Sequence, residues 1–110
     1  MVSERPKYGF EDLAVYRAAR VFRRNIYRLL RKLPEEEKYA LVPQMRRAAI
    51  SLTNNIAEGH GRYHYQENIQ FLRQARGSLE ELLDDINICA DEGYTKPSPS
   101  NNSRIKATNC

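Results

Sequence analysis

Apolar residues recur at steps of three and four along three long segments of the chain, which is the spacing of one face of an α-helix. The pattern predicts three helices, over residues 13–33, about 36–58 and about 65–92. Pro34 follows the first segment and Gly93 follows the third. Both residue types commonly end helices, so they support these boundaries.

Three positions near or inside the predicted helices need a structural reason. Pro43 lacks a backbone N–H, so either the second helix kinks there, or a short turn ends near Leu41 and the main helix begins at Pro43. Gly59 suits the position just after the second helix. Gly77 lies inside the third segment among other small residues, and this predicts close approach of a neighbouring helix.

Long amphipathic helices joined by short turns indicate an all-α fold, an up-down antiparallel helical bundle. We expect residues 1–94 to form this helical domain. Residues 95–110 are rich in Ser, Asn and Pro, and Ile105 is their only large aliphatic residue, so we expect a disordered polar tail. Three such helices could close a core, but a missing fourth helix would leave one side of it open. We expect the exposed apolar surface to drive formation of a homo-oligomer.

The composition excludes several protein classes. No apolar run approaches the ~20 residues that cross a bilayer, and residues 1–10 lack the apolar stretch of a signal peptide. We therefore expect no membrane association. The two cysteines, Cys89 and Cys110, are too few for a disulfide scaffold and wrongly spaced for a zinc site. The chain is therefore expected in the reducing cytoplasm.

Charge is distributed unevenly along the 110 residues, whose formal net charge is +4. Residues 13–33 contain seven basic residues and no acidic one, whereas residues 79–92 contain six acidic residues and no basic one. The distribution of charge is therefore more informative than its sum.

Five arginines of the first predicted helix follow one another at steps of three, four, four and three, so they share one face of that helix. An arginine face is the expected footprint of phosphate contacts. Arginine binds carboxylates equally well, so the same face could instead pair with the acidic segment of the same or another subunit, or simply be solvated. Arg46 and Arg47 of the second helix point away from its apolar stripe. The candidate nucleic-acid-binding residues are Arg17, Arg20, Arg23, Arg24, Arg28, Arg31, Lys32, Arg46 and Arg47.

No arrangement of residues predicts catalysis. His60 and His64 have the spacing of metal ligands on a helix, but Gly61 lies between them, and loop histidines explain them better. Cys89 lies on the apolar stripe of the third helix, where a thiol acts as a small apolar group. The acidic residues Glu80, Glu81, Asp84 and Asp85 are better explained as a solvated or partner-facing surface than as an acid–base site. We expect no enzyme activity, metal, cofactor or small-molecule substrate.

Three stretches carry a family resemblance: F-E-D-L-A-V-Y-R-A-A at Phe10–Ala19, Q-M-R-R-A-A-I-S-L-T-N-N-I-A-E-G at Gln44–Gly59, and F-L-R-Q-A-R-G-S-L-E-E-L at Phe71–Leu82. The chain resembles the small four-helix-bundle proteins encoded in intervening sequences of bacterial 23S rRNA genes. It is similar also to accessory proteins of diversity-generating retroelements, which bind nucleic acid. The resemblance implies an up-down bundle that assembles into a basic pentamer. The chain departs from the family at Pro43 and after Tyr94, where a polar tail replaces the fourth helix.

These observations predict a non-catalytic protein that binds structured RNA or other nucleic acid, DNA included, with low sequence specificity and as a homo-oligomer. One alternative is a protein-interaction adaptor that binds no nucleic acid. Another is a truncated fragment of a family member.

Overall fold

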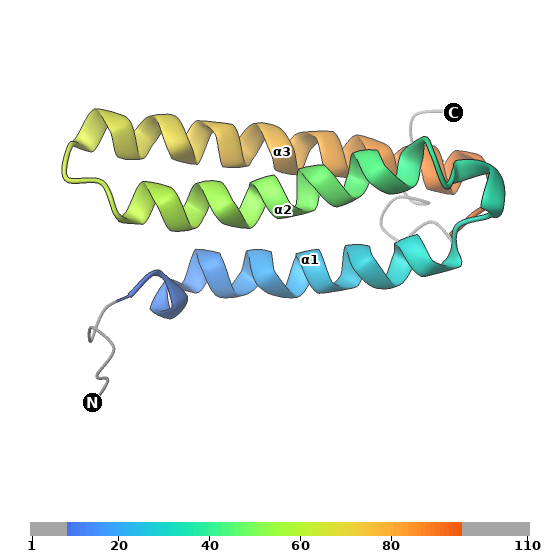
Figure 1. Cartoon of the computed structure of the whole chain (residues 1–110), viewed down its shortest axis with the longest axis horizontal. Coiled ribbons are helices and arrows are strands. Elements are labelled where there is room, and N and C mark those ends of the chain that lie inside the picture. Colours follow the sequence, from blue (N-terminus) through green and yellow to red (C-terminus); the bar gives the residue numbers. More distant parts are fainter. Residues whose placement is uncertain (1–8, 96–110) are drawn as a thin grey trace, which may run out of the picture.

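The computed structural model describes residues 9–95, and over that range it contains helices and no strand. The three α-helices are α1 (Ala14–Lys32), α2 (Leu41–His60) and α3 (Tyr65–Asp91). They run up, down and up in an antiparallel bundle (Figure 1). The predicted all-α up-down fold is confirmed. The expected polar tail lies outside the described residues except for Thr95, and so do residues 1–8 of the predicted domain.

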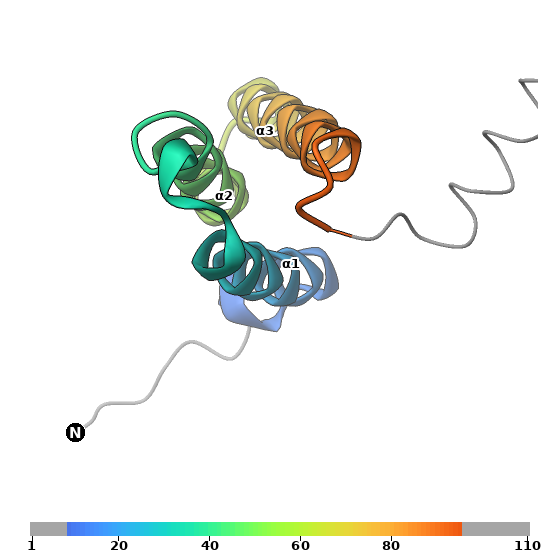
Figure 2. The same ribbon diagram turned by 90° about the vertical axis from the view of Figure 1, so that its right-hand side faces the viewer.

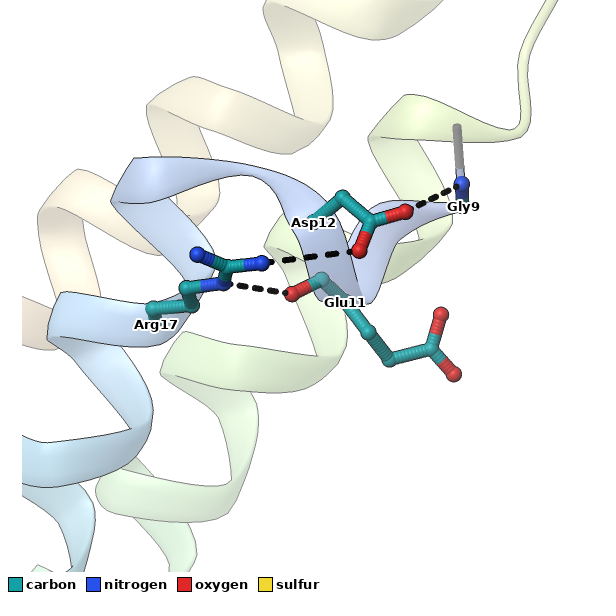
Figure 3. A network of polar contacts seen from close by, with 4 residues as sticks. All are labelled: Gly9, Glu11, Asp12 and Arg17. Carbon is teal, nitrogen blue, oxygen red and sulfur yellow. Dashed lines mark hydrogen bonds and ion pairs between the residues drawn. The ribbon is translucent and has the colours of Figure 1, made fainter. Parts of the chain in front are cut away.

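The start of α1 is preceded by a single 3₁₀ turn, η1 (Phe10–Asp12). Leu13 occupies the N-cap position of α1. The Asp12 carboxylate accepts a hydrogen bond from the Gly9 N–H at 3.3 Å and pairs with Arg17 at 3.5 Å (Figure 3). These contacts anchor the chain entering α1.

The second helix begins later than the apolar pattern predicts. A 3₁₀ turn, η2 (Glu35–Glu37), takes the first residues of the predicted segment, and α2 starts at Leu41. Pro43 therefore lies in the first turn of α2, where a backbone N–H has no partner inside the helix. Of the two alternatives for Pro43, the one with a short turn before the main helix is close to the structure.

The glycine at which a neighbouring helix comes close is Gly59 and not Gly77. The small-residue cluster around Gly77 does meet α2, since Ser78 Oγ donates to Ser51 Oγ at 3.0 Å. Gly77 is exposed, and a Cβ built on it would meet no atom within 4 Å. Gly59 is buried inside α2 rather than following it, because α2 continues to His60. A Cβ on Gly59 would lie 3.0 Å from the Cβ of Phe71, so α2 and α3 come together closely there.

The end of α3 is a Schellman turn, as Gly93 predicts. Gly93 has φ of 79°, a conformation that favours glycine. The Tyr94 N–H donates to the Cys89 carbonyl at 2.8 Å, and the Gly93 N–H donates to the Ala90 carbonyl at 3.1 Å. The Tyr94 hydroxyl donates to Glu37 at 2.7 Å, and this hydrogen bond raises the pKa of Tyr94 to about 12. The end of α3 is thereby fixed against η2.

Helix α2 is central to the core, since it packs against both α1 and α3 (Figure 2). The largest fully buried side chains are Met45 and Thr53 of α2, and Leu82 and Cys89 of α3. Ile26 and Leu30 bury the inner face of α1 against α2. The apolar core residues are Ala19, Ile26, Leu30, Leu41, Met45, Ala48, Ala49, Leu52, Ile56, Ala75, Leu82 and Cys89.

The side of the bundle between α1 and α3 is open among the described residues. Two hollows follow this side, with volumes of about 240 and 640 Å³, and Phe22 lines both. We call them together the α1–α3 groove. Its α1 wall includes Val15, Ala18, Phe22 and Leu29, and its α3 wall includes Leu79 and Ile86. Within residues 9–95, no fourth helix covers this side.

Candidate nucleic-acid interface

The basic residues of α1 lie on the side of the helix that faces away from the core. Ala19, Ile26 and Leu30 form its buried face. The five arginines of the predicted face are all exposed: Arg17, Arg20, Arg24, Arg28 and Arg31. The helical period thus places apolar and basic residues on different sides of α1.

Arg23 differs from these five because it lies at the contact between α1 and α2. Its Nη1 donates a hydrogen bond to Thr53 Oγ1 at 2.7 Å. Thr53 is only 1% exposed, and its hydroxyl donates in turn to the Ile50 carbonyl at 3.3 Å. Arg23 is therefore half-buried and held in one orientation by α2.

Arg46 of α2 joins the basic surface of α1 through an aromatic contact. Its guanidinium carbon lies 5.5 Å from the ring centroid of Tyr27, within the range of a cation–π interaction. Arg47 is also exposed, but it lies ~100° further around α2. Unlike Arg46, Arg47 makes no hydrogen bond, ion pair or ring contact with α1 among the described residues.

Between α1 and α2 the basic side chains surround a hollow of about 440 Å³, which we call the arginine hollow. No acidic residue lines it. The lining residues are Arg23, Arg24, Tyr27, Arg28, Arg31 and Ile50. Arg17 and Arg20 lie nearer the N-terminus of α1, and Lys32 lines the α1–α3 groove instead. The structure therefore gathers four of the nine candidate residues around one concave site.

Most of these cations have no carboxylate partner within residues 9–95. Arg17 pairs with Asp12, and Arg28 donates to the neutral amide of Asn25 at 3.3 Å. The side chains of Arg20, Arg24, Arg31 and Lys32 make no ion pair with any described residue. The outer face of α1 thus carries positive charge that its own described surroundings do not compensate.

The acidic segment of α3 does not supply partners to α1 within the chain. Glu80 pairs with Arg76 of the same helix at 3.5 Å. Asp85 is buried and accepts a hydrogen bond from Gln44 of α2 at 2.9 Å. Among the described residues, no ion pair joins α1 to Glu81 or Asp84. The intramolecular form of the arginine–carboxylate hypothesis is therefore absent, which leaves pairing between subunits.

A model of the 23S rRNA-intervening sequence protein family matches residues 11–110. The chain belongs to this family. The match includes all three helices and therefore the whole basic face of α1. No curated protein matches the chain in sequence. Among the described residues of this family member, no helix is long and apolar enough to span a bilayer, and no three His, Cys, Asp or Glu side chains gather as metal ligands would.

Asp85 is the least favourably placed charge that the structure describes. Its side chain is at the α2–α3 contact, the residue is 2% exposed, and Oδ2 has no hydrogen-bond partner there. Burial and the nearby carboxylates of Glu81 and Asp84 raise the pKa of Asp85, while the hydrogen bond from Gln44 acts in the opposite direction. The sequence places Asp85 in an acidic surface cluster, but the helical turn directs it into the core.

Cys89 follows Asp85 by one turn of α3 and is fully buried. Burial raises the pKa of the Cys89 thiol, and the charges of Asp85 and Glu37 raise it further. A thiol in this setting stays protonated, whereas a nucleophilic cysteine requires the thiolate. This environment agrees with a packing role for Cys89.

Several residues of the basic site could not be predicted from the sequence. Thr53 and Ile50 show no chemical signal in the sequence, yet they orient Arg23 and line the arginine hollow. The pairing of Tyr27 with Arg46 joins two helices, so helical periodicity cannot reveal it. The only available signal was the presence of tyrosines beside the arginine face.

Proposed function

We propose that this member of the 23S rRNA-intervening sequence protein family is a non-catalytic RNA-binding protein. The observation that supports the proposal is the basic face of α1, where Arg20, Arg24 and Arg31 are exposed and have no carboxylate partner among the described residues. Such a face attracts phosphate groups and releases their counterions, which is the main source of affinity for nucleic acid.

The proposed binding has low sequence specificity. Arginines spread along one helix contact phosphates, and phosphate contacts position a nucleic acid without reading its bases. The family description includes 23S rRNA, and for this reason we take RNA, rather than DNA, as the partner. Structured RNA presents closely spaced phosphates that a basic face about the length of α1 can follow.

We propose further that the protein acts as a homo-oligomer in the bacterial cytoplasm, with the pentamer of the family as the expected assembly. The α1–α3 groove supports this part of the proposal. Val15, which lines the groove, is 55% exposed. Contiguous apolar surface of this kind usually marks a contact with another protein.

The triple substitution of Arg20, Arg24 and Arg28 by glutamine tests the RNA-binding face. We expect weaker retention of every RNA sequence and a shallower dependence of log affinity on log salt, because fewer phosphates are neutralised. The matched control replaces Lys38, Arg73 and Arg76, which are exposed elsewhere, and so removes the same charge. Equal losses in both variants would show that only net charge matters, and would contradict binding through α1.

Light scattering of the same variants, with and without RNA, separates RNA binding from a protein-interaction adaptor. If the arginines of α1 pair with Glu80, Glu81 or Asp84 of another subunit, the triple variant loses oligomer mass. In that case the wild-type protein also shows no salt-sensitive retention of RNA. RNA binding instead predicts unchanged oligomer mass in the triple variant and a gain of mass when RNA is added to the wild type.

A further inference from the structure

The arginine hollow concentrates more charge than contact with a continuous phosphate backbone requires. Four guanidinium groups line one site of about 440 Å³ with no acidic residue among them. This volume falls in the range of ordinary ligand sites, about 300 to 1,000 Å³. Arg17 and Arg20, on the same helix, lie outside it. The basic face is therefore uneven, with a concave centre between α1 and α2.

The guanidinium of Arg23 is fixed before any ligand arrives. Its hydrogen bond to Thr53 joins it to a nearly inaccessible hydroxyl, and that hydroxyl is itself bonded to the backbone of α2. An arginine has five N–H donors, so donors remain for a ligand after Thr53 is bonded. A pre-oriented cation loses less side-chain entropy on binding, and this favours a specific ligand over diffuse attraction.

The number of arginines indicates which phosphate the hollow suits. A phosphodiester within a strand carries one negative charge and has two neighbours on the chain, so it can contact a convex face. A phosphate monoester carries about −1.5 to −2 charges at neutral pH and has three acceptor oxygens. Guanidinium groups bind such oxygens through charge-assisted, often bidentate hydrogen bonds. Convergence of several arginines thus matches a monoester better than a diester.

One aromatic and one aliphatic residue complete the site. Tyr27 and Ile50 line the hollow beside the arginines, and Arg46 lies against the Tyr27 ring. A nucleoside attached to the bound phosphate would find an aromatic ring and an aliphatic side chain next to it. Aromatic and guanidinium planes are the usual partners of unpaired bases in RNA recognition.

From this geometry we propose that the arginine hollow binds the terminal phosphate monoester of an RNA strand, and so gives the protein a preference for phosphorylated strand ends. The inference rests on the proposed RNA binding and adds a chemical class of ligand to it. The remaining basic face of α1 then follows the phosphodiesters that extend from that end.

The test compares one RNA oligonucleotide prepared with a 5′-phosphate, with a 3′-phosphate and with hydroxyl groups at both ends. We expect at least one phosphorylated form to bind about tenfold more tightly than the hydroxyl form, as new charge-assisted hydrogen bonds imply. Inorganic phosphate should compete with that preference. Because the second pKa of a phosphate monoester is about 6, the preference should decline as the pH falls below that value.

Variants locate the preference within the protein. Arg24→Gln with Arg31→Gln removes two exposed guanidinium groups of the hollow, and we expect it to abolish the preference. Arg20→Gln with Lys32→Gln removes the same charge from α1 outside the hollow, and should weaken all three RNAs alike while the preference persists. Helical circular dichroism confirms folding of both variants.

The possible results distinguish the terminal-phosphate site from RNA binding itself. Equal binding of all three RNAs would overturn the terminal-phosphate site and leave RNA binding intact. A preference that survives in Arg24→Gln with Arg31→Gln would also overturn the assignment to this hollow. Failure of every RNA to bind the wild-type protein would overturn RNA binding and the terminal-phosphate site together.

Discussion

The α2–α3 pair and helix α1 use their surfaces in contrasting ways. Helices α2 and α3 close on each other through fully buried side chains and interhelical hydrogen bonds, such as the one between Ser78 and Ser51 at 3.0 Å. The Asn68 side chain also donates to the Gly59 carbonyl at 2.7 Å. Helix α1 packs on α2, leaves the groove toward α3 open, and exposes most of its cations.

This difference predicts that stability depends mainly on the α2–α3 pair and that the proposed RNA binding depends mainly on α1. Polar contacts such as Asn68 to Gly59 fix the register of α2 against α3, because a buried donor left without a partner would destabilise the fold. Among the described residues, the side-chain hydrogen bond between α1 and α2 is that of Arg23 with Thr53. Exposed arginines on α1 can therefore change without loss of the core, and binding and stability should respond to different substitutions.

The same leucine-to-alanine substitution should cost much more stability in the α2–α3 pair than in α1. Leu82 is 0% exposed between α2 and α3, so Leu82→Ala should lower the free energy of unfolding by about 3 kcal/mol. Leu29 of α1 is half-buried beside the groove, so Leu29→Ala should lower it by only about 1 kcal/mol. Urea unfolding followed by circular dichroism measures both. Equal losses would contradict the difference in packing.

Replacement of two glycines by alanine should change stability in opposite directions. Gly59→Ala forces a Cβ to 3.0 Å from Phe71, and should lower stability by about 1 to 2 kcal/mol. Gly77→Ala meets no atom within 4 Å inside an exposed stretch of α3, and should raise stability by up to about 1 kcal/mol through helix propensity. Thermal unfolding of the two variants gives the signs. Stabilisation by Gly59→Ala would show that α2 and α3 are less tightly apposed.

Substitution of Asp85 should have a smaller effect on stability, and this effect should depend on pH. Asp85→Asn removes a buried charge, and should raise the free energy of unfolding at neutral pH by about 1 kcal/mol. Because the folded pKa of Asp85 is raised, the folded state holds the proton more tightly than the unfolded state. The Asp85 contribution to stability therefore falls as pH rises from the unfolded pKa through the folded pKa.

The difference in stability between Asp85→Asn and the wild type, measured as a function of pH, tests this dependence. The advantage of Asp85→Asn over wild type should be small in acid and should widen toward neutral pH, as read from urea midpoints. Asp84→Asn is the matched control, because Asp84 is exposed on the same turn of α3. An advantage that shrinks as pH rises would contradict the burial of an unsatisfied carboxylate.

Local signals explain why α1 and α3 could be predicted closely from the sequence. Pro34 and Gly93 act within one or two residues of the helix ends, and the observed helices Ala14–Lys32 and Tyr65–Asp91 agree with the prediction to within one residue. The start of α2 is harder to predict from the sequence, because a 3₁₀ turn and an α-helix share the same apolar and acidic pattern. Only the position of Pro43 distinguishes them.

Features that depend on two helices at once could not be predicted. Gly59 lies just after one predicted helix and Gly77 within another, and the sequence does not show which of them a neighbouring helix approaches. Only the position of Phe71 in the packed structure shows that a Cβ would be crowded at Gly59. The arginine face of α1 follows from helical spacing alone. Its concave centre does not, since it requires Arg23 to meet Thr53 across the α1–α2 contact.

The salt dependence of RNA retention by the wild-type protein tests whether the basic face of α1 binds RNA phosphates. Each neutralised phosphate contributes a slope of about −0.7 to −0.9 to log affinity against log salt, so contacts to about four to six phosphates predict a slope of about −3 to −5. We expect clear retention at ~50 mM salt that falls steeply by ~200 mM. Absence of retention at ~50 mM, or retention that salt leaves unchanged, would contradict binding of RNA phosphates by the basic face of α1.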